Sequence, residues 1–542
     1  MDIPTLLLSS FVIAVSALLF FIWSLRKGVL DPDPAAAKVI FSKGEIGRVE
    51  EPAVSAASER ELQRSVTAAV PAEADADELQ ARLEADRSAS RPAFVLLGFA
   101  VLWLLVASFA GLTSSIKLHE PDWLTQYAWL TFGRIRTLHL NAVAYGWAPM
   151  AALGIALWMM PRLLKTKLVG ARFAIAGAVL WNIGLVIGLV CIALGINDGM
   201  EWLEIPWQVG TLFVVGGALI GLPLVFTLRR RKVEHLYVSV WYMGAALFWF
   251  PVLYLVAKLP GVHFGVEQAT MNWWFGHNVL GLFYTPLSLA AVYYFLPKVI
   301  GRPIQSYNLS LIGFWCLAFF YGQVGGHHLV GGPVPEWLVT LSIVQSMMMI
   351  VPVVAFSVNQ HLTMRGRFSA LRHSPTLRFV VLGGMMYTLS SIQGSFEALR
   401  SISTVTHFTH FTVAHAHLGL YGFVTLVMFG AIYFAMPRIV SREWPYPKLI
   451  AAHFWLVTVG FAIYFVTLTA GGVLQGLAML DASQPFIESV RVTLPYLQGR
   501  SIGGALMTLG HLVFAAHFTV MALRRGPQRN EAALLRPLVQ AV

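Results

Sequence analysis

The sequence predicts an all-α polytopic membrane protein, in which one extra N-terminal transmembrane helix precedes a bundle of twelve. Two observations lead to this fold class. Hydrophobic residues make up 57% of the 542 residues and charged residues only 12%, about half the charged share of a soluble domain. Apolar runs of roughly 20 residues recur along the chain, the length that a transmembrane helix needs. Because lipid cannot hydrogen-bond the backbone, runs of this length indicate helices.

Basic residues give the predicted bundle a direction. The net charge of +11 could suggest a nucleic-acid partner, but the basic side chains cluster in short loops at every second helix end. This alternation follows the positive-inside rule, so we expect these loops to face the cytoplasm and no nucleic acid to bind. The clusters are Arg26 and Lys27; Arg162, Lys165 and Lys167; Arg229, Arg230, Arg231 and Lys232; Lys298 and Arg302; Arg365, Arg367 and Arg372; Arg438 and Arg442; and Arg524 and Arg525.

The N-terminal region differs from the rest of the chain. The apolar segment from Thr5 to Trp23 lacks a small-residue cleavage site, so residues 1–29 are expected to form a retained transmembrane helix rather than a signal peptide. Residues 30–92 are polar, rich in Ala and Glu, and interrupted by prolines. This composition predicts a cytoplasmic linker with a helix in ELQARLEADR.

Twelve apolar segments follow and define a domain over residues 93–526, with a cytoplasmic tail over 527–542. Each segment is long enough to span a bilayer as a helix. The predicted segments are 93–116, 134–161, 171–195, 207–228, 236–258, 271–297, 307–331, 336–359, 378–398, 408–436, 448–472 and 501–523.

Six histidines lie inside these segments, near the ends that the charge pattern places outside. Polar residues at membrane depth are costly and usually functional. A lone buried histidine is often a packing residue, but six at one depth weaken that interpretation. Imidazole suits copper, iron and zinc, and the two cysteines form no metal-binding pair. The histidines are His139, His277, His327, His328, His415 and His417.

Helix geometry separates these histidines into groups. On an α-helix, residues two apart point about 200° apart, so His415 and His417 face opposite sides and each can bind a different metal centre. His327 and His328 are about 100° apart and can bind one metal together with His277. His139 is then the opposite ligand for one of the first pair. The pattern predicts a three-histidine metal, a one-histidine metal and a two-histidine metal.

At these residues the chain resembles the catalytic subunits of haem-copper oxidases, and among them the cbb3-type, or C-family, cytochrome c oxidases. The resemblance covers roughly residues 93 to 525. It rests on four stretches in the expected order: LHLNAVAYGW, WWFGHNVLGLFYTPLSLAAVYYFLPK, SYNLSLIGFWCLAFFYGQVGGHHL and VAHAHLGLYGF.

The resemblance implies a function and a set of ligands. It implies the twelve-helix haem-copper oxidase bundle, in a bacterial cytoplasmic membrane, reducing O2 to water with electrons from cytochrome c and translocating protons. His139 and His417 correspond to the axial ligands of a low-spin haem b, and His415 to the proximal ligand of a high-spin haem b. The copper ligands correspond to His277, His327 and His328.

Tyr321 corresponds to the catalytic tyrosine of the C family, which is covalently linked to the copper ligand matching His277. A phenol beside the metals can supply an electron and a proton together when the O–O bond breaks. The alternative is a packing aromatic residue with a satisfied hydroxyl.

Two other functions remain as alternatives. Nitric oxide reductases share the fold and the six histidines, but they place a Glu four residues after the first copper-type ligand, where this chain has Gly281. A non-haem iron needs that carboxylate, whereas three imidazoles suit copper. The stretch THFTHFTVAHAHLGLYG nevertheless reads like the reductases. The other alternative is a non-catalytic membrane transporter or haem-binding protein.

The resemblance also implies supporting residues. Arg136 is expected to pair with a haem propionate, near Trp273 and Trp274, and Glu201 in NDGMEWLEIPW to hold a calcium ion, with Glu204 close by. Calcium prefers oxygen ligands. A proton path of hydroxyl residues is expected on two neighbouring helices. Its members are Tyr293, Tyr294, Tyr307 and Ser310, leading to Tyr321.

Two features depart from the usual catalytic subunit, and one absence implies partner subunits. Gln393 stands where the family usually has a Glu, 22 residues before the proximal histidine, and such partners tune metal ligands. No C-x-x-C-H motif is present, so membrane-anchored c-type cytochrome subunits are expected as partners. The stretch IWSLRKGVLDPDPAAAKVIF weakly resembles a small single-helix assembly protein of the same oxidases.

Overall fold

The structure of the protein is a computed structural model that describes residues 34–52, 56–66 and 76–526. It also describes five isolated positions nearer the N-terminus, which are Val15, Leu19, Ile22, Trp23 and Arg26. The expected tail over residues 527–542 lies outside the described residues, and so does most of the expected helix over residues 1–29.

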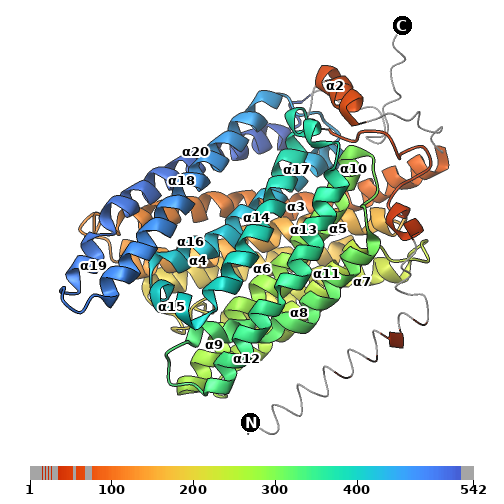
Figure 1. Cartoon of the computed structure of the whole chain (residues 1–542). Helices are drawn as coiled ribbons and strands as arrows, with labels where there is room; N and C mark the ends of the chain where they lie inside the picture. The colour runs from red at the N-terminus through yellow and green to blue at the C-terminus, as the bar shows by residue number, and fades with distance from the viewer. Residues whose placement is uncertain are drawn as a thin grey trace.

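Within the described ranges, the regular elements are all helical, and the long helices lie side by side in one bundle (Figure 1). Eleven segments of the described chain are long and apolar enough to cross a membrane, which confirms the predicted class of multi-pass membrane protein. The eleven are Ala76–Ile116, Phe132–Leu163, Ala171–Leu194, Trp207–Arg229, Val238–Lys258, Gly265–Ile300, Tyr307–Leu329, Glu336–Met364, His410–Val440, Pro447–Leu480 and Ile487–Ala522.

The twelfth predicted segment, 378–398, forms helix α14 (Pro375–Glu397) but is too polar to stand among those eleven. Its second half carries Ser390, Ser391 and Ser395, whose side chains line an internal cavity rather than lipid. A helix that faces a cavity can carry polar residues that a lipid-facing helix cannot.

Several spans consist of one uninterrupted α-helix. They begin with α3 (Ala76–Ile116) and include α6 (Ala171–Leu194), α7 (Trp207–Arg229), α8 (Val238–Lys258), α18 (Pro447–Leu480) and α20 (Leu494–Ala522). Another span joins α12 (Glu336–Met348) to α13 (Ile350–Met364). Short elements at the ends are η1 (Pro34–Lys38), α2 (Ala56–Val66), η2 (Ala128–Leu130), η6 (Phe368–Arg372), α15 (Arg400–Thr406) and α19 (Ile487–Arg491).

The four spans that carry the six histidines change helix type partway along. Three contain a π-helical turn that begins one to four residues after a histidine, and π-turns inside α-helices are frequent at functional sites. In the fourth, a 3-10 helix carries two histidines and Tyr321. The spans are α4 (Phe132–Ala142), η3 (Val143–Trp147) and α5 (Ala148–Leu163); α9 (Gly265–Val279), η4 (Leu280–Tyr284) and α10 (Thr285–Ile300); α16 (His410–His417), η7 (Leu418–Thr425) and α17 (Leu426–Val440); and α11 (Tyr307–Phe320) with η5 (Tyr321–Leu329).

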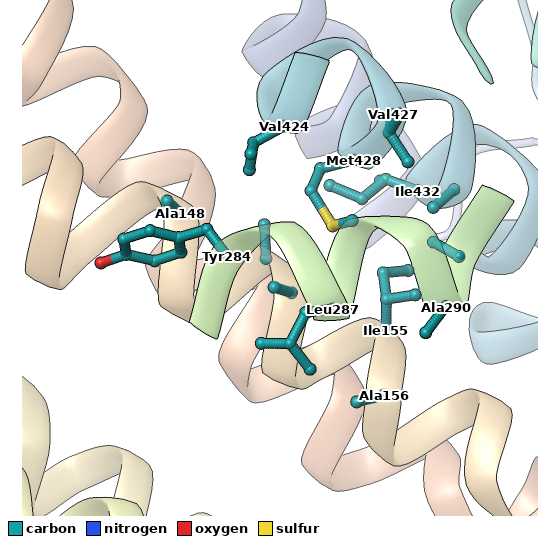
Figure 2. Packing of buried hydrophobic residues seen from close by; sticks show 14 of the residues in the cluster. Ala148, Ile155, Ala156, Tyr284, Leu287, Ala290, Val424, Val427, Met428 and Ile432 are labelled. Atoms are coloured by element: carbon teal, nitrogen blue, oxygen red, sulfur yellow. The ribbon is translucent and has the colours of Figure 1, made fainter. Parts of the chain in front are cut away.

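Three of these spans form the centre of the bundle. Figure 2 shows residues of α5, α10 and α17 packed against one another, with Ala148, Ala156 and Ala290 among the larger Met428 and Ile432. All five side chains are at most 2% exposed. Small residues let helices approach closely, and dense packing resists small displacements. The histidines are therefore held on rigid supports.

Residues 34–52, which we name the N-terminal clamp, pack against the end of the bundle where α5, α10 and α17 finish (Figure 1). The clamp backbone meets α10 directly, because Gly47 donates a hydrogen bond to the carbonyl of Gly301 (2.7 Å). Gly301 ends α10 in a left-handed conformation (φ +59°), and a β-carbon there would overlap the backbone of Arg48. Only glycine suits both requirements.

Buried ion pairs join the clamp to four helices. Lys298 of α10 and Arg82 of α3 contact Glu45 at 2.7 and 2.5 Å. Arg438 of α17 and Arg162 of α5 contact Glu50 at 2.5 and 3.5 Å. Burial raises the pKa of both carboxyls, but the neighbouring Lys and Arg side chains outweigh it and hold each pKa below its ordinary range. A third carboxylate, Glu51, accepts hydrogen bonds from Ser374 and Thr376 at the start of α14.

The described part of residues 30–92 is therefore not a free polar linker. The acids Glu45, Glu50 and Glu51 of the clamp are buried, and α3 continues without interruption across the expected boundary at residue 92. The sequence did not predict this burial, because acidic and alanine-rich sequence is typical of linkers. Here the basic helix ends neutralise the acids, which allows them to be buried.

Candidate metal centre

One cavity of about 400 Å³ collects all six histidines at the opposite end of the bundle from the clamp. Its walls come from α3, α4, α9, η5, α14, α16, α18 and α20, so residues far apart in the sequence meet there. Tyr321, Arg136, Glu201 and Trp273 also line it.

Three histidines form a compact group in this cavity. One ring nitrogen from each of His277, His327 and His328 lies within 4.8 Å of the others. Their ring centroids are 4.4 to 5.4 Å apart. Across the described residues, no other three His, Cys, Asp or Glu side chains converge in this way. The three imidazoles are therefore a candidate ligand set for one metal ion.

The hydrogen bonds around this group leave nitrogen atoms free for a metal. Nδ1 of His327 donates to Ser346 Oγ (3.0 Å), whose own proton goes to the carbonyl of Ser342 (2.7 Å). The Nε2 lone pair of His327 is therefore available. Nδ1 of His277 is buried and has no hydrogen-bond partner within the described chain. A buried polar atom without a partner is unfavourable, and a bound copper ion would satisfy it.

His139 and His417 form a second, separate arrangement. Their rings are parallel, at an angle of 6° with centroids 6.2 Å apart. Each Nδ1 lies 2.8 Å from a backbone carbonyl, that of Ala107 or Val413. A carbonyl only accepts, so each Nδ1 carries the proton and each Nε2 has a lone pair that could bind a metal. On His417 this Nε2 lies 3.2 Å from the Tyr464 hydroxyl. Two metal–nitrogen bonds of about 2 Å each fit the spacing of the two rings, as axial ligation of one haem iron requires.

His415 faces the other side of the same helix. Its ring lies against α14, where Gln393 Oε1 is 3.3 Å from Nδ1. A β-carbon at Gly394 would approach the imidazole to 2.7 Å, so α14 leaves room for the ring only because this position is glycine. His417 instead contacts Tyr464 of α18. The two histidines therefore serve different parts of the cavity, and the donor set fits haem and copper cofactors.

Tyr321 lies beside His277, with ring centroids 5.1 Å apart. Tyr321 precedes His327 by six residues in the 3-10 helix η5. The ring of His277 lies close to both side chains, with its centroid 5.0 Å from that of His327. A β-carbon at Gly281 would overlap the Tyr321 ring. A side chain at position 281 and the observed position of Tyr321 are thus mutually exclusive.

The predicted propionate and calcium residues contact each other. Arg136 forms an ion pair with Glu201, and Asn272 donates to the backbone carbonyl of Glu201 (2.5 Å). Glu204 is buried and accepts a hydrogen bond from Asn141 (3.0 Å). Burial raises the pKa of Glu204 to about 7. The calcium site at Glu201 stays a prediction.

The four predicted proton-path residues are buried, but no continuous series of hydrogen bonds within the described chain connects them. Tyr307 donates to the carbonyl of Leu236 (3.1 Å), and Ser310 to that of Tyr307 (2.6 Å). Tyr294 accepts from Arg162 (3.1 Å) in the clamp network. The hydroxyl of Tyr293 is buried with no partner among the described residues, and its ring stacks on Tyr242 at 5.9 Å. The proton path over these four residues therefore stays a prediction.

Sequence reasoning missed several residues of the cavity. Ser346 supports His327 from α12, and Tyr464 of α18 lies 3.2 Å from Nε2 of His417. Arg500 of α20 lines the cavity near the same histidine. Arg500 could have been found from the sequence, because it is an arginine at the end of the bundle that has few basic residues. No sequence signal identifies Ser346 or Tyr464, because serine and tyrosine are common in such helices.

A helical membrane bundle that presents these six histidines to one cavity belongs to the class of haem-copper oxidases. Residues 91–506 match the family model described as Cytochrome C and Quinol oxidase polypeptide I. The chain belongs to this family, which confirms the resemblance seen in the sequence and its assignment as an oxidoreductase.

Curated relatives and a solved structure agree with this assignment. The chain is 31% identical over 431 residues to the Cbb3-type cytochrome c oxidase subunit CcoN1 of Stutzerimonas stutzeri, covering 77% of this chain and 91% of the relative. It is 30% identical to the cytochrome c oxidase subunit 1 homolog of Agrobacterium tumefaciens, covering 80% and 83%. A cryo-EM structure of a heme-copper terminal oxidase dimer shares the fold, with a TM-score of 0.68 and 16% identity over 83% and 86% of the chains.

The alternative family is more distant. A nitric oxide reductase subunit of Stutzerimonas stutzeri is 24% identical, over 80% of this chain and 94% of the reductase. The comparisons therefore favour the oxidase prediction over the reductase.

Proposed function

We propose that this chain is the catalytic subunit of a terminal oxidase that reduces O2 to water with electrons from cytochrome c, coupled to proton translocation. The observation that carries the proposal is the three-histidine group with Tyr321 against His277, in the same cavity as the parallel pair of His139 and His417. The Cbb3-type relative supports this choice of donor and reaction.

The proposed cofactors are two haem b groups and one copper ion, which would supply electron transfer and the oxygen-binding site. His139 and His417 hold the low-spin haem, His415 the high-spin haem, and His277, His327 and His328 the copper. Arg136 and Arg500 bring positive charge to the low-spin side of the cavity, where propionates would lie. Glu201 is the proposed calcium ligand.

Tyr321 is the proposed donor of a proton and an electron beside the metals, joined covalently to His277 in the mature enzyme. Its contact with Gly281 also argues against a reductase, because the carboxylate expected at position 281 in the reductases would occupy the space of the phenol. Protons are proposed to reach Tyr321 from the end of the bundle that bears the clamp, along the two helices that carry Tyr293, Tyr294, Tyr307 and Ser310.

The proposed setting is a bacterial cytoplasmic membrane, with the clamp end in the cytoplasm. The chain carries no C-x-x-C-H motif. We therefore propose that membrane-anchored c-type cytochrome subunits lie over the low-spin haem and pass electrons to it from cytochrome c.

Metal analysis with a pyridine haemochrome assay tests the proposal on the purified oxidase complex. We expect two haems and one copper per chain and faster turnover with O2 than with NO. His417→Leu should abolish the low-spin haem spectrum while the protein still assembles. A preparation without copper, or a low-spin spectrum that survives His417→Leu, contradicts the ligand assignment.

A further inference from the structure

The one acidic side chain of α14, Glu397, lies near the proximal histidine candidate. Glu397 stands one helical turn after Gln393, so both residues share a face of the helix. Its Oε2 atom is 3.9 Å from Nδ1 of His415. The sequence pattern gave Glu397 no role, because the residue expected to contact His415 was the one at position 393.

The surroundings of Glu397 hold its carboxylate toward His415. Thr412, on the same helix as His415, donates a hydrogen bond to Oε1 (2.9 Å). The other oxygen, Oε2, is buried and has no hydrogen-bond partner in the described chain. The residue as a whole is 9% exposed. A buried carboxylate with one oxygen anchored and the other unsatisfied is costly unless a donor reaches it.

Gln393 does not by itself satisfy His415. Its amide oxygen is 3.3 Å from Nδ1, slightly longer than the usual 2.7–3.2 Å of an N–H···O bond. An amide oxygen is also a weaker acceptor than a carboxylate. Metal-bound histidines usually donate their second N–H to a carboxylate, carbonyl or water, and that partner raises the basicity of the ligand.

We propose that Glu397 is the positioning residue that accepts the Nδ1–H of His415 and polarises it, replacing the carboxylate missing at position 393. The inference rests on the proposed haem ligation by His415. The hydrogen bond would form by closing the 3.9 Å gap between Oε2 and Nδ1, while Thr412 anchors the other carboxylate oxygen, Oε1. The negative charge then favours the oxidised state of the high-spin haem.

The test is a redox titration of the high-spin haem in the intact oxidase, together with the iron–histidine stretching frequency from resonance Raman. Glu397→Gln should favour the reduced haem about tenfold, which is about 59 mV for one electron, and should lower the stretching frequency. Adding Gln393→Glu to that variant should restore both values. Glu336→Gln, an exposed carboxylate that pairs with Arg400, is the matched control and should change neither.

Unchanged potential and frequency in Glu397→Gln, with the high-spin haem present, would overturn the role of Glu397 and leave the proposed function intact. Absence of a high-spin haem in the wild-type protein would contradict the proposed function instead. If Glu397→Gln does not assemble, Thr412→Val removes only the anchoring hydroxyl and should shift both values in the same direction. No shift in Thr412→Val then counts against the proposal.

Discussion

The two ends of this bundle bury polar side chains in opposite ways. At the clamp end, Glu45 and Glu50 are at most 4% exposed, and each lies between two basic side chains. At the histidine end, nitrogen atoms of comparable burial have their lone pairs left over, as Nδ1 of His277 shows. Paired ions stabilise a structure, whereas histidine nitrogen atoms with free lone pairs can bind a metal. We therefore assign stabilisation of the bundle to the clamp end and chemistry to the histidine end.

The residues that match the family model include the histidine end but not the clamp. The match begins at residue 91, so the clamp lies outside it, although the partners Arg162, Lys298 and Arg438 lie inside. The clamp thus adds acids from outside the matched region to basic helix ends within it.

Tyr321→Phe tests the chemical end and should have the largest effect. Both haems and copper should remain, because the ligands are untouched, while O2 reduction falls by at least about 100-fold, as expected for loss of a proton donor. Oxygen-electrode assays measure the rate. Mass spectrometry of wild-type peptides should show Tyr321 linked to His277. A wild-type protein that reduces NO much faster than O2, with Tyr321→Phe unchanged, would instead indicate a reductase.

Glu50→Gln tests the structural end. It leaves the buried guanidinium of Arg438 without its acidic partner, which costs about 3–5 kcal/mol. Thermal stability in detergent should fall, and protease should reach residues 34–52 sooner, while the spectra of the haems in the surviving protein stay the same. Glu488→Gln, which removes a more exposed pair with Arg491, should cost less than about 1 kcal/mol. Equal losses in the two variants would show that the clamp is not a stabilising element.

Lowering the pH should weaken the clamp end, with the smallest effect of the three tests. The pKa values of Glu45 and Glu50 lie below their ordinary value of 4.5 in the folded protein. The unfolded chain therefore binds more protons, and the stability that these carboxylates contribute is present above about pH 4.5 and lost as pH falls below it. Each unit of pKa difference is about 1.4 kcal/mol. Hydrogen exchange should accelerate in residues 34–52 before the core of α10; simultaneous exchange would contradict this.

The sequence predicts the parts of this molecule that depend on composition along the chain. Long apolar runs identify the spans, and six histidines stand out because polar residues are rare there. The clamp could not be predicted, because Arg162, Lys298 and Arg438 look like ordinary loop residues of the positive-inside pattern. Ser346 and Glu397 lie close to histidines of other helices, and one sequence contains no information on that proximity.

The contact between Gly281 and Tyr321 has a consequence for how such enzymes diverge. A glutamate at 281 and a phenol at 321 compete for the same volume, so the two states cannot be exchanged by independent single substitutions. One order of change passes through an overfilled site, and the other through a site that has lost its phenol before it gains a carboxylate. A chain that changes by this route therefore passes through a state in which neither the phenol arrangement nor the carboxylate arrangement is intact.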